Sequence, residues 1–188
     1  MPGYVSSPAI WKDGVKKAYY GFLGFTFLDI LAAIFSIIPV IGWILNIVVA
    51  VLIIICYVYF LIGLKGMRSS LVNLDDAAAV NNIYTGSIIG IVGAIVFAIP
   101  LISFVGGILS IIAYVMMLLG YNKMRNSVSL PPLAKSGAFL LFIAMIVELI
   151  AGFLGFIPFA GAIIGAIGSV AVFILGLMGW KKISDSEL

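Results

Sequence analysis

The sequence has little of what a soluble protein depends on. Charged residues make up 9% of its 188 residues, whereas a soluble domain carries about 25%, so the chain has too little polar surface to stay in water as a folded domain. Histidine is absent and Cys56 is the one cysteine, which excludes an intramolecular disulfide and a Cys/His metal set. The chain is 64% hydrophobic, with a mean hydropathy of +1.33. This composition is typical of an integral membrane protein.

Six apolar runs follow one another along the chain, separated by proline, glycine and charged residues. Each run has 17–22 residues, close to the ~20 with which a helix crosses ~30 Å of hydrocarbon. Only helices and closed barrels satisfy their backbone hydrogen bonds in lipid, and these continuous runs lack the alternation of barrel strands. The sequence therefore predicts an all-α membrane protein with six transmembrane helices over 18–38, 43–64, 83–99, 104–121, 137–157 and 162–180.

The turns between paired runs repeat one pattern. They are PVIG at 39–42, PLIS at 100–103 and PFAG at 158–161, and each pair of runs ends in a similar polar segment. Proline ends a helix at or near the residue before it, and Gly42 and Gly161 allow a tight reversal. Such an internal repeat indicates three tandem helical hairpins. The predicted hairpins are 18–70, 83–127 and 137–186, within a single transmembrane domain, 1–188.

The basic residues predict the orientation. Every lysine and arginine lies near the N-terminus, between hairpins or near the C-terminus, and the turns within hairpins have no charge. By the positive-inside rule, both termini and both long loops face the cytoplasm, in the cytoplasmic membrane. The net charge of +3 then follows from topology, and the short loops offer no dense basic patch for nucleic acid. The aromatic residues expected to form a belt on the cytoplasmic side are Trp11, Tyr19, Tyr20, Tyr121 and Trp180.

Two acidic residues fall inside predicted spans. Asp29 lies ten residues before Pro39, and Glu148 lies ten residues before Pro158, so the two acids occupy the same position of the repeat. The middle repeat has Gly90 there. Ten residues of helix rise ~15 Å, which places both carboxyl groups near the middle of the bilayer. Small residues share a helix face with each acid, so we expect both acids to face the bundle interior or a partner helix.

Two interpretations of the acids stay open. Intramembrane carboxylates often mark ion and proton paths, so Asp29, Glu148 and Asn46 are candidates for a proton or cation site. The alternative is a neutral carboxylic acid that is hydrogen-bonded across helices and contributes only to packing, with Asn46 bonding Asp29 or a partner helix. The predicted spans contain no lysine, arginine or histidine as a counter-ion, which favours the neutral form under either interpretation.

Glycines of the last span and two acids before the third span are predicted to have structural roles. Gly161-x-x-x-Gly165 matches the small-residue motif of membrane helices. The glycines predicted to pack helices in the last span are Gly161, Gly165, Gly168 and Gly176. Asp75 and Asp76 are expected to form a solvated first turn of the third span, where the helix dipole favours negative charge.

Parts of the sequence resemble a known family. The segments IPVIGWILNIVVAVLIIICYVYFLIGLKGM at 38–67 and AVNNIYTGSIIGIVGAIV at 79–96 resemble an uncharacterised archaeal and bacterial family of small multi-spanning membrane proteins, known as a domain of unknown function. The resemblance implies a polytopic membrane protein and brings no assigned activity or site residue.

The sequence leaves two functions open for a polytopic membrane protein. The first is a non-enzymatic structural or accessory subunit that acts by helix packing in a homo-oligomer or a larger membrane complex. The alternative is a small proton- or cation-linked transporter or channel that uses Asp29 and Glu148. Neither function needs a cofactor or a metal. The chain has no serine, threonine or cysteine with an identifiable base, so we expect no enzymatic activity. The expected partners are the lipid bilayer and other membrane subunits or further copies of the chain.

Overall fold

The fold is a bundle of six long helices. The computed structural model describes residues 7–38, 41–155, 157 and 160–186. Its helices are α1 (Pro8–Phe35), α2 (Ile41–Ser70), α3 (Leu74–Phe97), α4 (Ser103–Arg125), α5 (Pro132–Leu154) and α6 (Ala160–Ser184), with a short 3₁₀ helix, η1 (Pro100–Ile102). All six long helices are apolar and long enough to cross a membrane. The chain is thus a multi-pass integral membrane protein with six spans.

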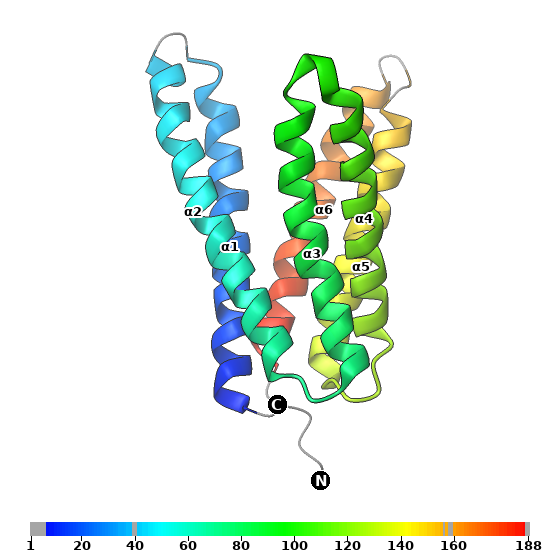
Figure 1. The fold of residues 1–188 in the computed structure, drawn as a ribbon. Helices are drawn as coiled ribbons and strands as arrows, with labels where there is room; N and C mark the ends of the chain where they lie inside the picture. The colour runs from blue at the N-terminus through cyan, green and yellow to red at the C-terminus, as the bar shows by residue number, and fades with distance from the viewer. Residues whose placement is uncertain (1–6, 39–40, 156, 158–159, 187–188) are drawn as a thin grey trace.

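The helices pack as three hairpins, which confirms the predicted architecture. The closest pairs are α1 with α2, α3 with α4, and α5 with α6. Weaker contacts join α2 to α3, α4 to α5, and α1 to α6, so the described helices form a closed ring. Figure 1 shows α1 beginning and α6 ending at one end of the bundle, here called the terminal end. At the opposite end, the turn end, the first hairpin diverges from the other two (Figure 1).

Polar caps extend the helices beyond the apolar runs. Helix α1 begins ten residues before its predicted span, where the Ser7 side chain accepts a hydrogen bond from the Ile10 backbone nitrogen. At α3, the Asn73 side chain accepts from the backbone nitrogen of Asp75 at 2.8 Å. Such caps satisfy N–H groups that have no partner within the helix. The first turns therefore stay helical although their sequences are polar.

Glycines let the two helices of each hairpin approach closely. A Cβ atom built on Gly63 of α2 would lie 2.3 Å from the Ala18 backbone nitrogen of α1. In the second hairpin, a Cβ on Gly106 would lie 2.3 Å from the Phe97 backbone nitrogen, and in the third, one on Gly137 would lie 2.5 Å from the Gly179 carbonyl oxygen. Real Cβ atoms do not approach so closely, so these positions require glycine. Close backbone packing at small residues is a main source of helix association in membranes.

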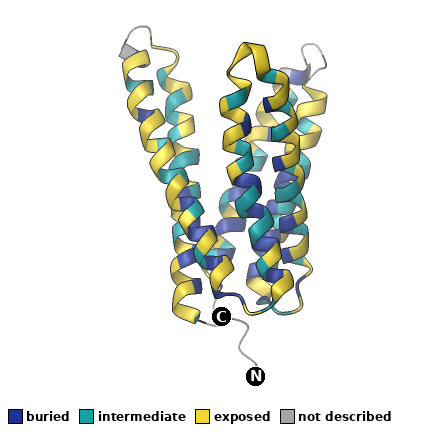
Figure 2. Ribbon diagram, in the orientation of Figure 1, coloured by how far each residue is buried: buried dark blue, intermediate teal, exposed yellow. Residues whose placement is uncertain are grey.

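Large side chains join the hairpins to one another at the terminal end. Trp180 of α6 is 1% exposed and packs against Phe60 of α2, with ring centroids 5.3 Å apart, and against Tyr121 of α4 at 6.4 Å. Figure 2 shows the buried residues concentrated in this half of the bundle. The predicted aromatic belt is therefore wrong for Trp11, Tyr121 and Trp180, because they lie in the core between helices. Tyr20 is exposed, as a belt residue would be.

The expectation of two solvated acids at the start of α3 is correct for one of them. Asp75 is exposed, whereas Asp76 is buried and accepts a hydrogen bond from the Ser129 hydroxyl of the loop between the second and third hairpins. The Ser127 hydroxyl oxygen in turn accepts from the Leu130 backbone nitrogen at 3.0 Å. Asp76 therefore helps fix the loop between two hairpins, a role that its position in the sequence does not reveal.

Candidate functional site

Asp29 and Glu148 line the same cavity. This cavity of ≈ 560 Å³ lies between the first and third hairpins, with walls from α1, α5 and α6. Its lining residues are Phe22, Phe25, Thr26, Asp29, Glu148, Ala151, Gly152, Gly165, Gly168, Ser169, Val172 and Phe173. The two acids, which lie 119 positions apart in the chain (148 − 29), meet there because α1 packs against α6 and closes the ring.

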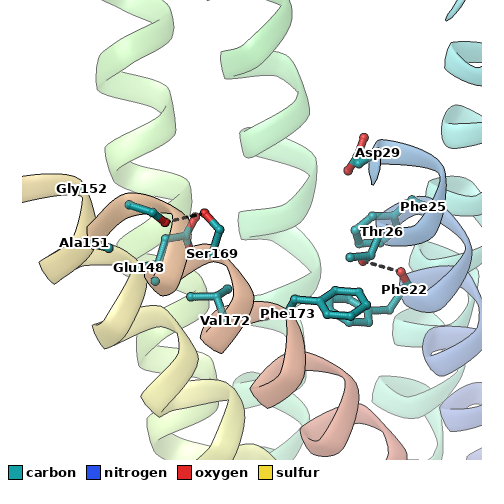
Figure 3. A pocket seen from close by; sticks show the side chains of 12 residues that line it. Phe22, Phe25, Thr26, Asp29, Glu148, Ala151, Gly152, Ser169, Val172 and Phe173 are labelled. Carbon is teal, nitrogen blue, oxygen red and sulfur yellow. Dashed lines mark hydrogen bonds between the residues drawn. The ribbon is translucent and has the colours of Figure 1, made fainter. Parts of the chain in front are cut away.

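One face of α1 forms the first wall. Phe22, Phe25, Thr26 and Asp29 follow the spacing of three, four and seven residues that places side chains on one side of a helix. The Asp29 side chain is exposed within the described structure. Figure 3 shows its carboxyl group beyond the Phe25 and Thr26 side chains. The α1 wall is thus aromatic on one part and acidic on the next.

Helices α5 and α6 form the opposite wall. Glu148 projects from α5, while Ser169 and Phe173 project from α6. In Figure 3, Glu148 and Ser169 lie together on the side of the cavity opposite Asp29. Alanine and glycine at 151, 152 and 165 leave space beside these side chains. The two carboxyl groups therefore approach the cavity from different hairpins.

The cavity offers hydrogen-bond acceptors and no cationic side chain among its lining residues. The Thr26 hydroxyl donates to the Phe22 carbonyl oxygen at 2.7 Å, and the Ser169 hydroxyl donates to the Gly165 carbonyl oxygen at 2.9 Å. Because both hydroxyl protons are used within their own helices, the oxygen lone pairs remain for a ligand. Together with two carboxyl groups, this lining suits a proton or a cation.

The described residues provide neither acid with a hydrogen bond or an ion pair. The packing interpretation expects an interhelical hydrogen bond at Asp29 and at Glu148, and no such bond is present between described residues. The Tyr114 hydroxyl of α4 bonds the Met145 carbonyl oxygen of α5 instead. Both carboxyl groups are therefore available to a ligand in the cavity.

Glu148 also borders a second cavity, of ≈ 260 Å³, lined by residues of α1, α3, α4, α5 and α6. Gly90 of α3 and Ser110 of α4 line it, together with Tyr121 and Trp180 from the aromatic core. Gly90 occupies the repeat position that Asp29 and Glu148 hold in the other hairpins. Each hairpin thus contributes its equivalent position to one of two adjoining cavities, and two of the three positions are acidic.

Asn46 does not meet either acid. It lies on α2, outside the lining of both cavities, and its side-chain oxygen is buried without a hydrogen-bond partner in the described structure. The structure places Asp29 and Glu148 on opposite walls of one cavity and Asn46 outside it.

The four glycines predicted to pack helices have different surroundings. A Cβ on Gly168 would lie 2.6 Å from the Ala151 Cβ, and one on Gly161 would lie 2.4 Å from the Gly155 carbonyl oxygen. A Cβ on Gly176 would lie 2.7 Å from the Phe22 ring, across the contact between α6 and α1. A Cβ on Gly165 would meet nothing within 4 Å. Gly165 therefore provides space in the cavity, and the other three lie against neighbouring atoms.

No family model matches this chain, and neither a curated protein nor a solved structure matches it. The resemblance to the family of unknown function stays a prediction. The assignment of the cavity depends on its geometry alone.

The aromatic lining of the cavity was not predicted from the sequence. Phe22 and Phe25 have the correct spacing to share a face with Asp29, and this signal was present in the sequence. No pattern in the sequence indicated Phe173, because its place in the cavity depends on the packing of α6 against α1.

Among the described residues, no group of three or more His, Cys, Asp or Glu could hold a metal ion.

Proposed function

We propose that the chain is a small membrane transporter that binds a proton or a cation at Asp29 and Glu148. The observation that supports this proposal is that the two acids, without internal partners, line one cavity between two hairpins. An ionisable residue inside a membrane is costly, and such residues usually mark a substrate or ion pathway. Transporters built from repeats often place their site near the bilayer midplane, where the repeats meet.

The packing of the bundle suggests how access to the cavity could change. Each hairpin is a close-packed unit held by its glycines, whereas fewer contacts join one hairpin to the next. Packed units that move as rigid bodies around a fixed site are the usual basis of alternating access. The terminal end is closed by the aromatic core around Trp180. By the charge distribution, the terminal end faces the cytoplasm.

The proposal is tested by flux through the purified protein in liposomes. Proton and monovalent-cation fluxes are measured for the parent protein and for Asp29→Asn and Glu148→Gln. We expect each amide variant to lose at least tenfold in flux, because the charge that attracts the ion is removed while the side-chain shape is kept. Asp13→Asn is the matched control, since Asp13 is an exposed acid of α1 that pairs with Lys17 outside the cavity.

Flux that is unchanged in both amide variants would contradict the transport proposal. Size-exclusion chromatography and helical circular dichroism of each variant show whether lost flux comes from lost folding. The liposomes are also assayed without protein, which sets the background leak.

A structural or accessory role is the second candidate. Gly107 of α4 has nothing within 4 Å of a Cβ position, so one small residue of this helix is not used in packing within the described structure. A packing subunit would use such a position against another copy or another membrane protein. For this role, the parent protein and the amide variants give no flux above the background leak and fold alike, and the protein is recovered from its membrane with partners in fixed stoichiometry.

A further inference from the structure

We propose that the cavity between the first and third hairpins binds a lipophilic organic cation, such as a quaternary or protonated amine with apolar substituents. This inference rests on the proposed transport function and adds the class of its substrate. Three properties of the cavity support it: the sign of its charge, the aromatic side chains on its walls, and its size.

With both acids ionised, the lining favours a positive ligand. Asp29 and Glu148 are on opposite walls, and no lysine, arginine or histidine is among the lining residues. The hydroxyl groups of Thr26 and Ser169 present oxygen lone pairs because their protons bond backbone carbonyl oxygens. An anion would meet only acceptors in the cavity, whereas a cation satisfies both carboxylates.

The aromatic side chains favour an organic cation. Phe22, Phe25 and Phe173 line the same cavity as the two acids. The faces of aromatic rings attract cations, and quaternary ammonium groups are recognised in this way. The Phe25 ring is supported from behind by Tyr57 at 5.3 Å and by Phe60 at 5.7 Å between ring centroids. This wall is thus held in place by the aromatic core before a ligand enters.

The size and composition of the cavity argue against a bare metal ion as the best ligand. Its volume of ≈ 560 Å³ lies within the ~300–1,000 Å³ of pockets for drug-sized molecules. A bare ion such as Ca²⁺ takes about six to eight oxygen ligands around it. The lining provides six side-chain oxygen atoms on four residues, and these are divided between opposite walls that are otherwise apolar. An organic cation with apolar substituents uses both the carboxylates and the apolar surface.

The inference is tested by binding of tetraphenylphosphonium to the full chain purified in detergent. Tetraphenylborate is the matched competitor, because it has the same shape and the opposite charge. We expect saturable binding of the labelled phosphonium that unlabelled phosphonium displaces and the borate does not. Asp29→Asn and Glu148→Gln should each weaken this binding at least tenfold.

Two leucine variants separate the aromatic contribution from general effects on the fold. Phe173→Leu removes one ring from the cavity and should weaken phosphonium binding about threefold to tenfold, as expected for loss of a cation–π contact. Phe27→Leu makes the same change on the exposed face of α1, outside the cavity lining, and should leave binding unchanged.

The possible outcomes separate this inference from the transport proposal. If the phosphonium does not bind the parent protein, or binds both amide variants as tightly as the parent protein, the organic cation is not the substrate. Proton or inorganic-cation flux that still depends on Asp29 and Glu148 would then leave the transport proposal in place. If neither flux nor binding depends on the two acids, both proposals are wrong. Reduced binding in Phe27→Leu to the same degree as in Phe173→Leu would overturn the aromatic part.

Discussion

The two ends of the bundle are built from the same six helices and pack differently. At the terminal end, large side chains such as Trp180, Phe60 and Tyr121 join helices of different hairpins. At the turn end, large apolar side chains point outward, with Leu101 90% and Trp43 71% exposed, and glycines hold each hairpin together internally. The difference shows that close packing within hairpins does not by itself join the hairpins into one body.

The acids lie where this packing changes. On α5, the buried residues end at Met145, and Glu148 follows less than one turn later. On α1, the buried residues end at Gly21, and Asp29 lies about two turns beyond. The aromatic core at the terminal end thus forms a base for the cavity between the first and third hairpins.

The largest expected effect comes from removing the aromatic contact at the closed end. Trp180→Ala should destabilise the bundle by ~3–5 kcal/mol, the range for a buried aromatic residue cut to alanine. Trp43→Ala makes the same change at the turn end, where the side chain is mostly exposed, and should change stability by less than about 0.5 kcal/mol. Thermal unfolding in one detergent compares the two. Equal losses would contradict the difference between the ends.

A smaller effect is expected within the first hairpin. Gly63→Ala places a methyl group against the α1 backbone at Ala18 and should cost ~1–3 kcal/mol through overpacking. Gly107→Ala is the control, because its methyl group would meet nothing within 4 Å and alanine favours the helix by up to about 1 kcal/mol. Unfolding of both variants in the same detergent measures the difference. A stabilising Gly63→Ala would show that the hairpin packs less closely than described.

Local features of the sequence predicted the spans and the hairpins. The turns, the apolar runs and the positions of charge are all contained in short segments, so three hairpins could be inferred without tertiary contacts. The rotation of each hairpin about its own axis could not be inferred in this way. For this reason Trp11 and Trp180 were expected at the membrane interface and lie in the core, and Asp76 was expected in solvent and is buried. The presence of Asp29 and Phe173 in one cavity depends on the same rotation.

The central proposal is that a charged ligand can enter the cavity between the first and third hairpins from water. Cysteine labelling with a charged, membrane-impermeant thiol reagent tests it, in a Cys56→Ala background. Ser169→Cys places a thiol in the cavity, and Ser87→Cys makes the same change at a residue that is 2% exposed. The account predicts fast labelling of the Ser169→Cys variant, slowed by tetraphenylphosphonium, and no labelling of the Ser87→Cys variant. A Ser169→Cys variant that labels no faster than the Ser87→Cys variant would contradict it.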